Sequence, residues 1–181
     1  MVVVKSRIPV IAFATLFLSS VDGYACSRRD SVSSVDMVNQ ADAIVRATAG
    51  EYIKPPRRFF PVWTTGEPET TIRFKVLEVI RGSMPPELIL PGYLSEWDDF
   101  NDHVPPYRFV RPNGRRGSCY ANTYRAGAQF LLILKKKQSG EFTVNWYGLG
   151  PVNEQLHSTD DPWLLWVREQ AKRQNALMWS R

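Results

Sequence analysis

Residues 127–134 have the sequence GAQFLLIL, and this continuous apolar run predicts a β-strand that is buried on both faces. The turn residues Gln138-Ser139-Gly140 follow the run, so Glu141 to Tyr147 is expected to form its hairpin partner. Upstream, Thr70 to Ile80 alternates apolar and polar residues, which predicts a second strand that ends at the turn Arg81-Gly82-Ser83. These segments favour a mainly β fold.

Further elements complete the expected order. A serine cap and apolar residues at helical spacing predict a short helix over Ser33 to Gln40, and Ala43 to Ile53 predicts a strand. Residues 54–69 contain four prolines and one glycine, which indicates a long loop between this strand and the strand that begins at Thr70. Glu87 to Leu90 predicts a shorter strand, and Asp160-Asp161-Pro162 begins a carboxy-terminal helix. Five short strands without alternating helices favour an antiparallel Greek-key barrel of the oligonucleotide/oligosaccharide-binding (OB) type.

The overall composition is that of one folded domain. The chain has 181 residues, of which 44% are hydrophobic and 23% charged, with a formal net charge of +5. These values exclude a disordered chain, a collagen and a coiled coil. Two cysteines and two histidines leave little material for a structural zinc site, which takes four such ligands.

The first 25 residues have the layout of a secretory signal peptide. Lys5 and Arg7 precede the apolar run Ile8 to Leu18, and the small residues Gly23 and Ala25 suit a cleavage site after Ala25. We therefore expect an exported protein, secreted or periplasmic, with residues 26–181 as a single domain and no transmembrane segment. The alternative is a bacterial lipoprotein acylated at Cys26, although Gly23 stands where such signals usually have an aliphatic residue.

Cys26 and Cys119 are the only cysteines of the chain. In an oxidising compartment we expect a disulfide between them, which in the chain-entropy model stabilises the fold by about 4 to 5 kcal/mol. The alternatives are free thiols, or an acylated Cys26 with Cys119 unpaired.

Several segments together carry a family resemblance. The mature amino-terminal Cys26 is followed by ADAIVRA at 41–47, FKVLEVIRG at 74–82, Ser118-Cys119-Tyr120, AQFLLI at 128–133, a hairpin and an apolar-basic helix. From Cys26 to about Arg173 the chain resembles the netrin-like or TIMP-like OB-fold family, which includes the tissue inhibitors of metalloproteinases.

The resemblance implies a disulfide from Cys26 to Cys119 and a secreted, non-enzymatic binding module. In the inhibitors the amine and carbonyl of the first Cys chelate the zinc of an extracellular protease, the next side chain enters its specificity pocket, and the segment before the paired Cys lies alongside. The matching positions here are Cys26, Ser27, Arg28, Arg116, Gly117, Ser118 and Cys119. The chain departs from the inhibitors at Arg28 and at Trp146-Tyr147, where they have further cysteines.

An alternative function is an OB-type binder of anionic polysaccharide or another polyanion. Basic and aromatic residues alternate in 107–116 and in 57–60, and Arg111, Arg115 and Arg116 are the candidate contacts. Nucleic acid is not an expected partner, because the protein is exported and its net charge is mild. A second interpretation of these aromatic residues is that they pin long loops to the barrel.

The remaining polar residues point to no catalytic site. His103 and His157 lie far apart in polar contexts, which indicates ordinary surface histidines. Glu96, Asp98, Asp99 and Asp102 lie beside Trp97 and Phe100 and are interpreted as a solvated acidic loop, with calcium binding as the alternative. No nucleophile and base can be paired, so we expect no enzymatic activity, no cofactor and no metal within the chain.

Overall fold

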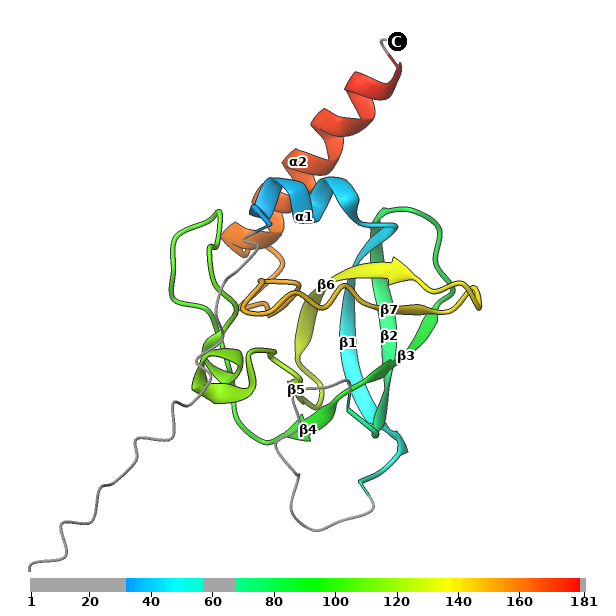
Figure 1. The fold of residues 1–181 in the computed structure, drawn as a ribbon, viewed down its shortest axis with the longest axis vertical. Helices are drawn as coiled ribbons and strands as arrows, with labels where there is room; N and C mark the ends of the chain where they lie inside the picture. Colours follow the sequence, from blue (N-terminus) through cyan, green and yellow to red (C-terminus); the bar gives the residue numbers. More distant parts are fainter. Residues whose placement is uncertain (1–31, 57–67, 180–181) are drawn as a thin grey trace, which may run out of the picture.

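The computed structural model describes residues 32–56 and 68–179, and its main feature is a curved six-stranded antiparallel sheet (Figure 1). The predicted signal segment and Cys26, Ser27, Arg28 and 57–60 lie outside the described residues. Two helices, α1 (Ser34–Gln40) and α2 (Pro162–Trp179), lie together at one end of the sheet. The strands of the sheet are β1 (Ala43–Lys54), β2 (Thr71–Arg81), β3 (Glu87–Pro91), β6 (Gln129–Lys136), β7 (Phe142–Val144) and β8 (Asn153–Gln155).

The apolar strand β6 organises the sheet. The strand order is β3-β2-β1-β6-β7, and β8 pairs with the first half of β6 while β7 pairs with its last residues. Phe130 to Leu134 are fully buried, so the prediction of a strand covered on both faces is confirmed. The edge strands β3 and β7 come within 8 Å of each other between Cα atoms, but no hydrogen-bonded ladder joins them within the described ranges.

Aromatic rings fill the centre of the sheet. The Phe74 ring lies 5.0 Å from that of Tyr124 and the Tyr124 ring 5.1 Å from that of Phe130, each pair meeting edge to face. This geometry is the one that the ring quadrupoles favour. Tyr124 belongs to β5 (Thr123–Arg125), which pairs in parallel with β4 (Tyr93–Ser95) outside the main sheet. The small β4–β5 sheet is therefore packed onto the core through this ring.

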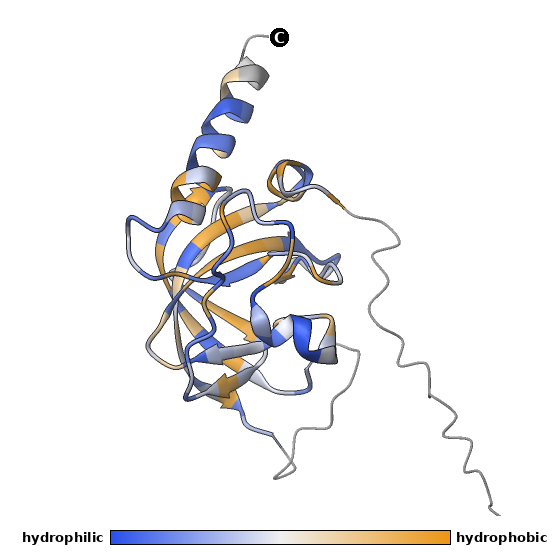
Figure 2. Ribbon diagram, turned by 90° about the vertical axis from the view of Figure 1, so that its left-hand side faces the viewer, coloured by the Kyte–Doolittle hydropathy of each residue, from blue (hydrophilic) through white to orange (hydrophobic). Residues whose placement is uncertain are grey.

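Both helices begin where the sequence predicts. Ser33 caps α1 by accepting a hydrogen bond from the Asp36 backbone N–H at 3.1 Å, and Asp161 caps α2 by accepting from the Trp163 N–H at 2.9 Å. Trp163 and Val167 are buried against the sheet end. The part of α2 beyond the sheet extends away from it, and its middle turns are hydrophilic (Figure 2). No helix within the described part of the chain is long and apolar enough to cross a membrane.

The expected count of five strands is wrong. The structure adds β4, β5 and β8, each of three residues, and shortens the predicted strand 141–147 to β7. A three-residue strand is too short to show a periodic pattern, and these strands exist only because a partner strand supplies their hydrogen bonds. The mainly β class with a short helix and a carboxy-terminal helix is confirmed.

Candidate binding site

The segment Gly114–Ser118 forms an irregular helical turn, η1, which contains part of the predicted partner-binding set. Arg115, Arg116 and Gly117 are exposed, whereas Gly114 and Ser118 at the two ends are buried. The turn therefore presents three consecutive residues to solvent from two buried anchor points.

Close packing and hydrogen bonds hold η1 in place. A Cβ on Gly114 would come within 2.5 Å of a Val110 methyl carbon and 2.8 Å of the Ala121 nitrogen, so only glycine fits there. Gly117 has φ +108°, a conformation that L side chains rarely adopt. After the turn, the Cys119 carbonyl accepts a hydrogen bond from the Leu149 N–H at 2.7 Å. These contacts order the turn before any partner binds.

The predicted contact residues are only partly within the described chain. The structure places Arg116, Gly117, Ser118 and Cys119 together on η1 and its exit. Cys119 is not a free cysteine. Because Cys26 lies outside the described residues, the disulfide between Cys26 and Cys119 stays a prediction.

Behind η1, the Arg111 side chain is completely buried. Its Nε donates to the Asn153 carbonyl at 2.9 Å and its Nη1 to Asp99 Oδ2 at 2.5 Å. Its Nη2 donates to the carbonyls of Thr123 at 2.6 Å and Ala121 at 3.1 Å. One side chain thereby ties together β8, β5 and the loops that precede and follow η1.

Aromatic rings and a second carboxylate complete this buried cluster. The Arg111 guanidinium carbon lies 5.4 Å from the Tyr124 ring centroid and 5.3 Å from that of Phe130. Glu154, also fully buried, accepts hydrogen bonds from the Arg111 backbone N–H at 3.1 Å and from Asn101 Nδ2 at 2.8 Å. Burial raises the pKa of Glu154 to about 7, and the nearby Arg111 charge opposes that rise. The Glu154 carboxyl is therefore poised to titrate near neutral pH.

Two sequence-based assignments need correction. Arg111 was a candidate contact for a polyanion, but its guanidinium has no exposed surface and already holds Asp99. The acidic group is a solvated loop only at Glu96, Asp98 and Asp102, because the Asp99 side chain is 15% exposed and bonded to Arg111. A buried cation needs a carboxylate partner, and the loop supplies it.

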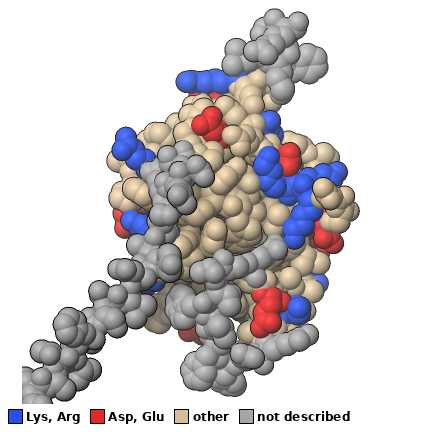
Figure 3. All heavy atoms as spheres, in the orientation of Figure 1, with Lys and Arg blue, Asp and Glu red and all other residues tan. Residues whose placement is uncertain are grey.

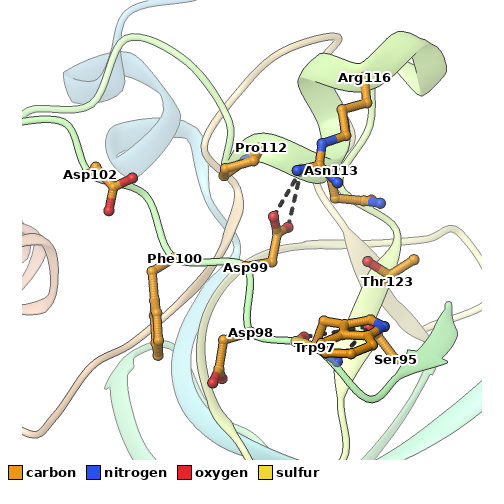
Figure 4. Close-up of a pocket in the computed structure, with 10 residues that line it drawn as sticks. All are labelled: Ser95, Trp97, Asp98, Asp99, Phe100, Asp102, Pro112, Asn113, Arg116 and Thr123. Carbon is orange, nitrogen blue, oxygen red and sulfur yellow. Dashed lines mark hydrogen bonds between the residues drawn. The ribbon is translucent and has the colours of Figure 1, made fainter.

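Next to η1 lies a hollow of about 410 Å³, which we call the Trp97 hollow (Figure 4). Asp99 lies at its centre, between Trp97 on one side and Asn113 on the other, and Arg116 lies on the side of η1. Both Asp99 oxygens accept from the Asn113 N–H, at 2.9 and 3.3 Å. The Trp97 side chain is 78% exposed, so its ring is available to a ligand.

The second carboxylate of the Trp97 hollow is also held in place. Asp98 accepts from Arg125 Nη1 through both oxygens, at 2.6 and 2.5 Å, and from Gln155 Nε2 at 2.5 Å. These bonds lower the pKa of Asp98, with Arg125 as the main cause. The carboxylate is therefore ionised and fixed in orientation.

Both histidines are exposed, as the sequence indicates. His103 Nε2 lies 3.0 Å from Arg115 Nη1, and the His157 ring stacks on Phe100 at 4.0 Å while its Nδ1 contacts Asp161 at 3.1 Å. Among the described residues no group of His, Cys, Asp and Glu side chains is arranged to hold a metal ion.

Exposed basic residues also lie away from η1. Figure 3 shows Lys and Arg side chains gathered near the β6–β7 turn, where Lys136 and Lys137 are exposed. Tyr107, part of the basic-aromatic segment, is buried and stacks on Trp163 at 4.7 Å. That aromatic residue pins a loop to α2, as the second interpretation expected.

Sequence analysis missed the roles of Trp97, Glu154 and Arg111. Trp97 lies in a loop among carboxylates, but a single aromatic residue in such a loop does not by itself indicate a site. Glu154 carried no sequence signal, since β8 is too short to be recognised.

Compared with known protein families and with curated proteins, the chain matches no family model and no curated protein.

Proposed function

We propose that this chain is a secreted, non-enzymatic binding module whose sheet closes into an OB-type barrel and which engages a protein partner beside Cys119. Support for the barrel comes from β1, which pairs with both β2 and β6, and from the approach of β3 to β7. An extracellular zinc protease is the specific partner that we propose, through Cys26 to Arg28 and residues 115–119.

The observation that carries this proposal is the ordered, exposed turn η1. Arg115, Arg116 and Gly117 project between the buried Gly114 and Ser118, and Cys119 is held by the Leu149 N–H. Because the turn is already ordered, little conformational entropy is lost when a partner binds. Arginine is one of the residue types, with tryptophan and tyrosine, that are enriched among the residues that contribute most to binding.

The decisive experiment is inhibition of a panel of zinc proteases by protein that begins at Cys26. If the Cys26 amine chelates zinc, one added amino-terminal alanine abolishes inhibition, since the chelating amine becomes an amide. Arg116→Ala weakens inhibition by about tenfold, and Arg73→Ala, at a partly exposed residue on β2, serves as the control. Inhibition that survives the added alanine would exclude chelation, and no inhibition of any protease would reject the proposed partner class.

The processing of the amino terminus is tested separately. We expect the intact mass of the exported protein to match a chain that starts at Cys26 and has lost two hydrogen atoms, as a disulfide requires. A mass increased by acyl chains would support the lipoprotein alternative. The same measurement after reduction and alkylation counts the thiols.

A second candidate, binding of a polyanion, now depends on Arg115 and Arg116, the exposed members of its predicted set. It predicts binding to a sulfated polysaccharide that falls steeply with salt. Arg115→Ala with Arg116→Ala should abolish it, whereas replacing Lys136 and Lys137 should not. If only the lysine variants lose binding, the polyanion binds at the β6–β7 turn and not at η1.

A further inference from the structure

The Trp97 hollow has the size and composition of a small-ligand site. Its volume of about 410 Å³ is within the range of roughly 300–1,000 Å³ that such sites occupy. Its lining combines an exposed indole with carboxylate, hydroxyl and guanidinium groups, from Trp97, Asp98, Asp99, Thr123 and Arg116 (Figure 4). The chemistry of these groups restricts which ligand fits.

Charge around the hollow is balanced. Arg125 pairs with Asp98 at 2.5 Å and Arg111 pairs with Asp99 at 2.5 Å. The two remaining charged groups of the lining, Asp102 and Arg116, have opposite signs. The three carboxylates and the three guanidinium groups cancel, so the net charge around the hollow favours neither a cationic nor an anionic ligand.

The fixed carboxylates retain capacity for further hydrogen bonds. An ionised carboxylate offers about four acceptor positions. Asp98 accepts from Arg125 and Gln155, and Asp99 accepts from Arg111 and the Asn113 N–H. The open positions favour hydroxyl donors, and the Arg116 guanidinium can donate to hydroxyl or ether oxygens.

The Trp97 ring supplies the apolar surface that complements such a ligand. The face of an indole carries partial negative charge, and the C–H groups on one face of a sugar ring carry partial positive charge. We propose that the Trp97 hollow binds a neutral sugar unit of a glycan, with the ring stacked on Trp97 and its hydroxyls bonded to Asp98, Asp99 and Arg116. This site shares Arg116 with the proposed protease contact, but it needs neither Cys26 nor the mature amino terminus.

The test is titration of the exported protein with neutral tetrasaccharides built from glucose, N-acetylglucosamine, mannose or galactose, by calorimetry and tryptophan fluorescence. At least one probe should bind, with an affinity that stays nearly constant between low and high salt. Trp97→Ala should weaken binding by about tenfold or more, and Trp97→Tyr, which keeps an aromatic face, by much less. Ile89→Ala, at another exposed apolar residue on β3, is the matched control and should bind as the parent does.

Three results would overturn the proposal. No binding of any probe would reject a neutral sugar site. Binding unchanged in Trp97→Ala would place the sugar elsewhere on the protein. Loss of protease inhibition in Trp97→Ala without sugar binding would assign Trp97 to the protein interface instead. Because the added amino-terminal alanine tests the protease proposal without touching Trp97, failure of one proposal is distinguishable from failure of the other.

Discussion

The cluster around Glu78 on the sheet surface and the cluster around Arg111 in the interior use the same chemical groups in different surroundings. Glu78 on β2 accepts from Arg46 Nε at 3.0 Å and from Arg168 Nη2 at 2.6 Å, and all three side chains retain contact with water. Arg111 contacts Asp99 through its guanidinium and Glu154 through its backbone, with no exposed surface of its own.

This difference determines what each cluster does. Water can replace a lost partner at Glu78, so the surface cluster adds modest stability where α2 contacts β2. Water cannot reach Arg111, so loss of that side chain would leave Asp99 without its cationic partner and the carbonyls of Asn153 and Thr123 without a donor. The buried cluster therefore constrains the loops that form the Trp97 hollow and η1.

The largest expected effect comes from breaking the buried cluster. Arg111→Met should lower the free energy of unfolding by about 3 to 5 kcal/mol, because it leaves Asp99 without its cationic partner and buried backbone carbonyls without a donor. Urea denaturation measures the loss, and the exposed Arg115→Met serves as the control. A change in the free energy of unfolding as small as that of the control would contradict the central role of Arg111.

A smaller effect with a distinctive pH dependence is expected for Glu154→Gln. The folded protein keeps a proton on Glu154 up to its raised pKa of about 7, whereas the unfolded chain loses that proton near 4.5. The contribution of Glu154 to the free energy of unfolding therefore falls as pH rises, by about 2 kcal/mol from about pH 5.5 to about pH 8. Glu154→Gln should remove that fall. If the stability of the two proteins changes with pH in the same way between pH 5.5 and pH 8, Glu154 does not have the raised pKa.

The surface cluster should respond with the opposite sign. Hydrogen bonding to Arg168, with a further contribution from Arg46, lowers the pKa of Glu78, so its stabilisation is present above its unfolded pKa and lost as pH falls below it. Glu78→Gln should lower the free energy of unfolding by about 1 kcal/mol or less near neutral pH, and high salt should make this decrease smaller. A salt-independent cost of several kcal/mol would remove the contrast between the two clusters.

The smallest effect on stability is expected at the Trp97 hollow. Trp97→Ala should leave the thermal midpoint close to that of the parent protein, because the residue is 78% exposed. Differential scanning calorimetry checks this expectation. A marked loss of stability would show that Trp97 supports the fold, and a sugar-binding defect in that variant could then not be assigned to lost stacking.

The parts of the fold that were predicted correctly are determined by residues close together in the sequence. The apolar run in β6, the Ser33 cap of α1 and the Asp161 cap of α2 are all visible within a few positions of sequence. The strands β4, β5 and β8 were missed because three residues cannot show a period, and each needs a distant partner.

The candidate site was predicted only in part for the same reason. Arg116 and Gly117 were proposed as contacts only from the family resemblance, which places a contact segment before Cys119; the structure shows that both are exposed, and their role in binding stays a prediction. The assignment of Arg111 as an exposed basic residue was wrong, since local sequence shows a charge but not its partner. Trp97 was noticed beside the acidic residues, but its place in a hollow depends on η1 and β5.

The sequence alone determined the positions of the main strands and helices, because side-chain periodicity, glycine turns and helix caps act over short distances along the chain. Only the tertiary structure decided which charges are buried, which carboxylates are held and where a hollow opens. Arg111 reaches Asp99, Asn153 and Glu154 across separations of 12, 42 and 43 residues. Such pairings depend on the folded arrangement of whole loops, and the low-dielectric interior that strengthens them does not exist until the chain is folded.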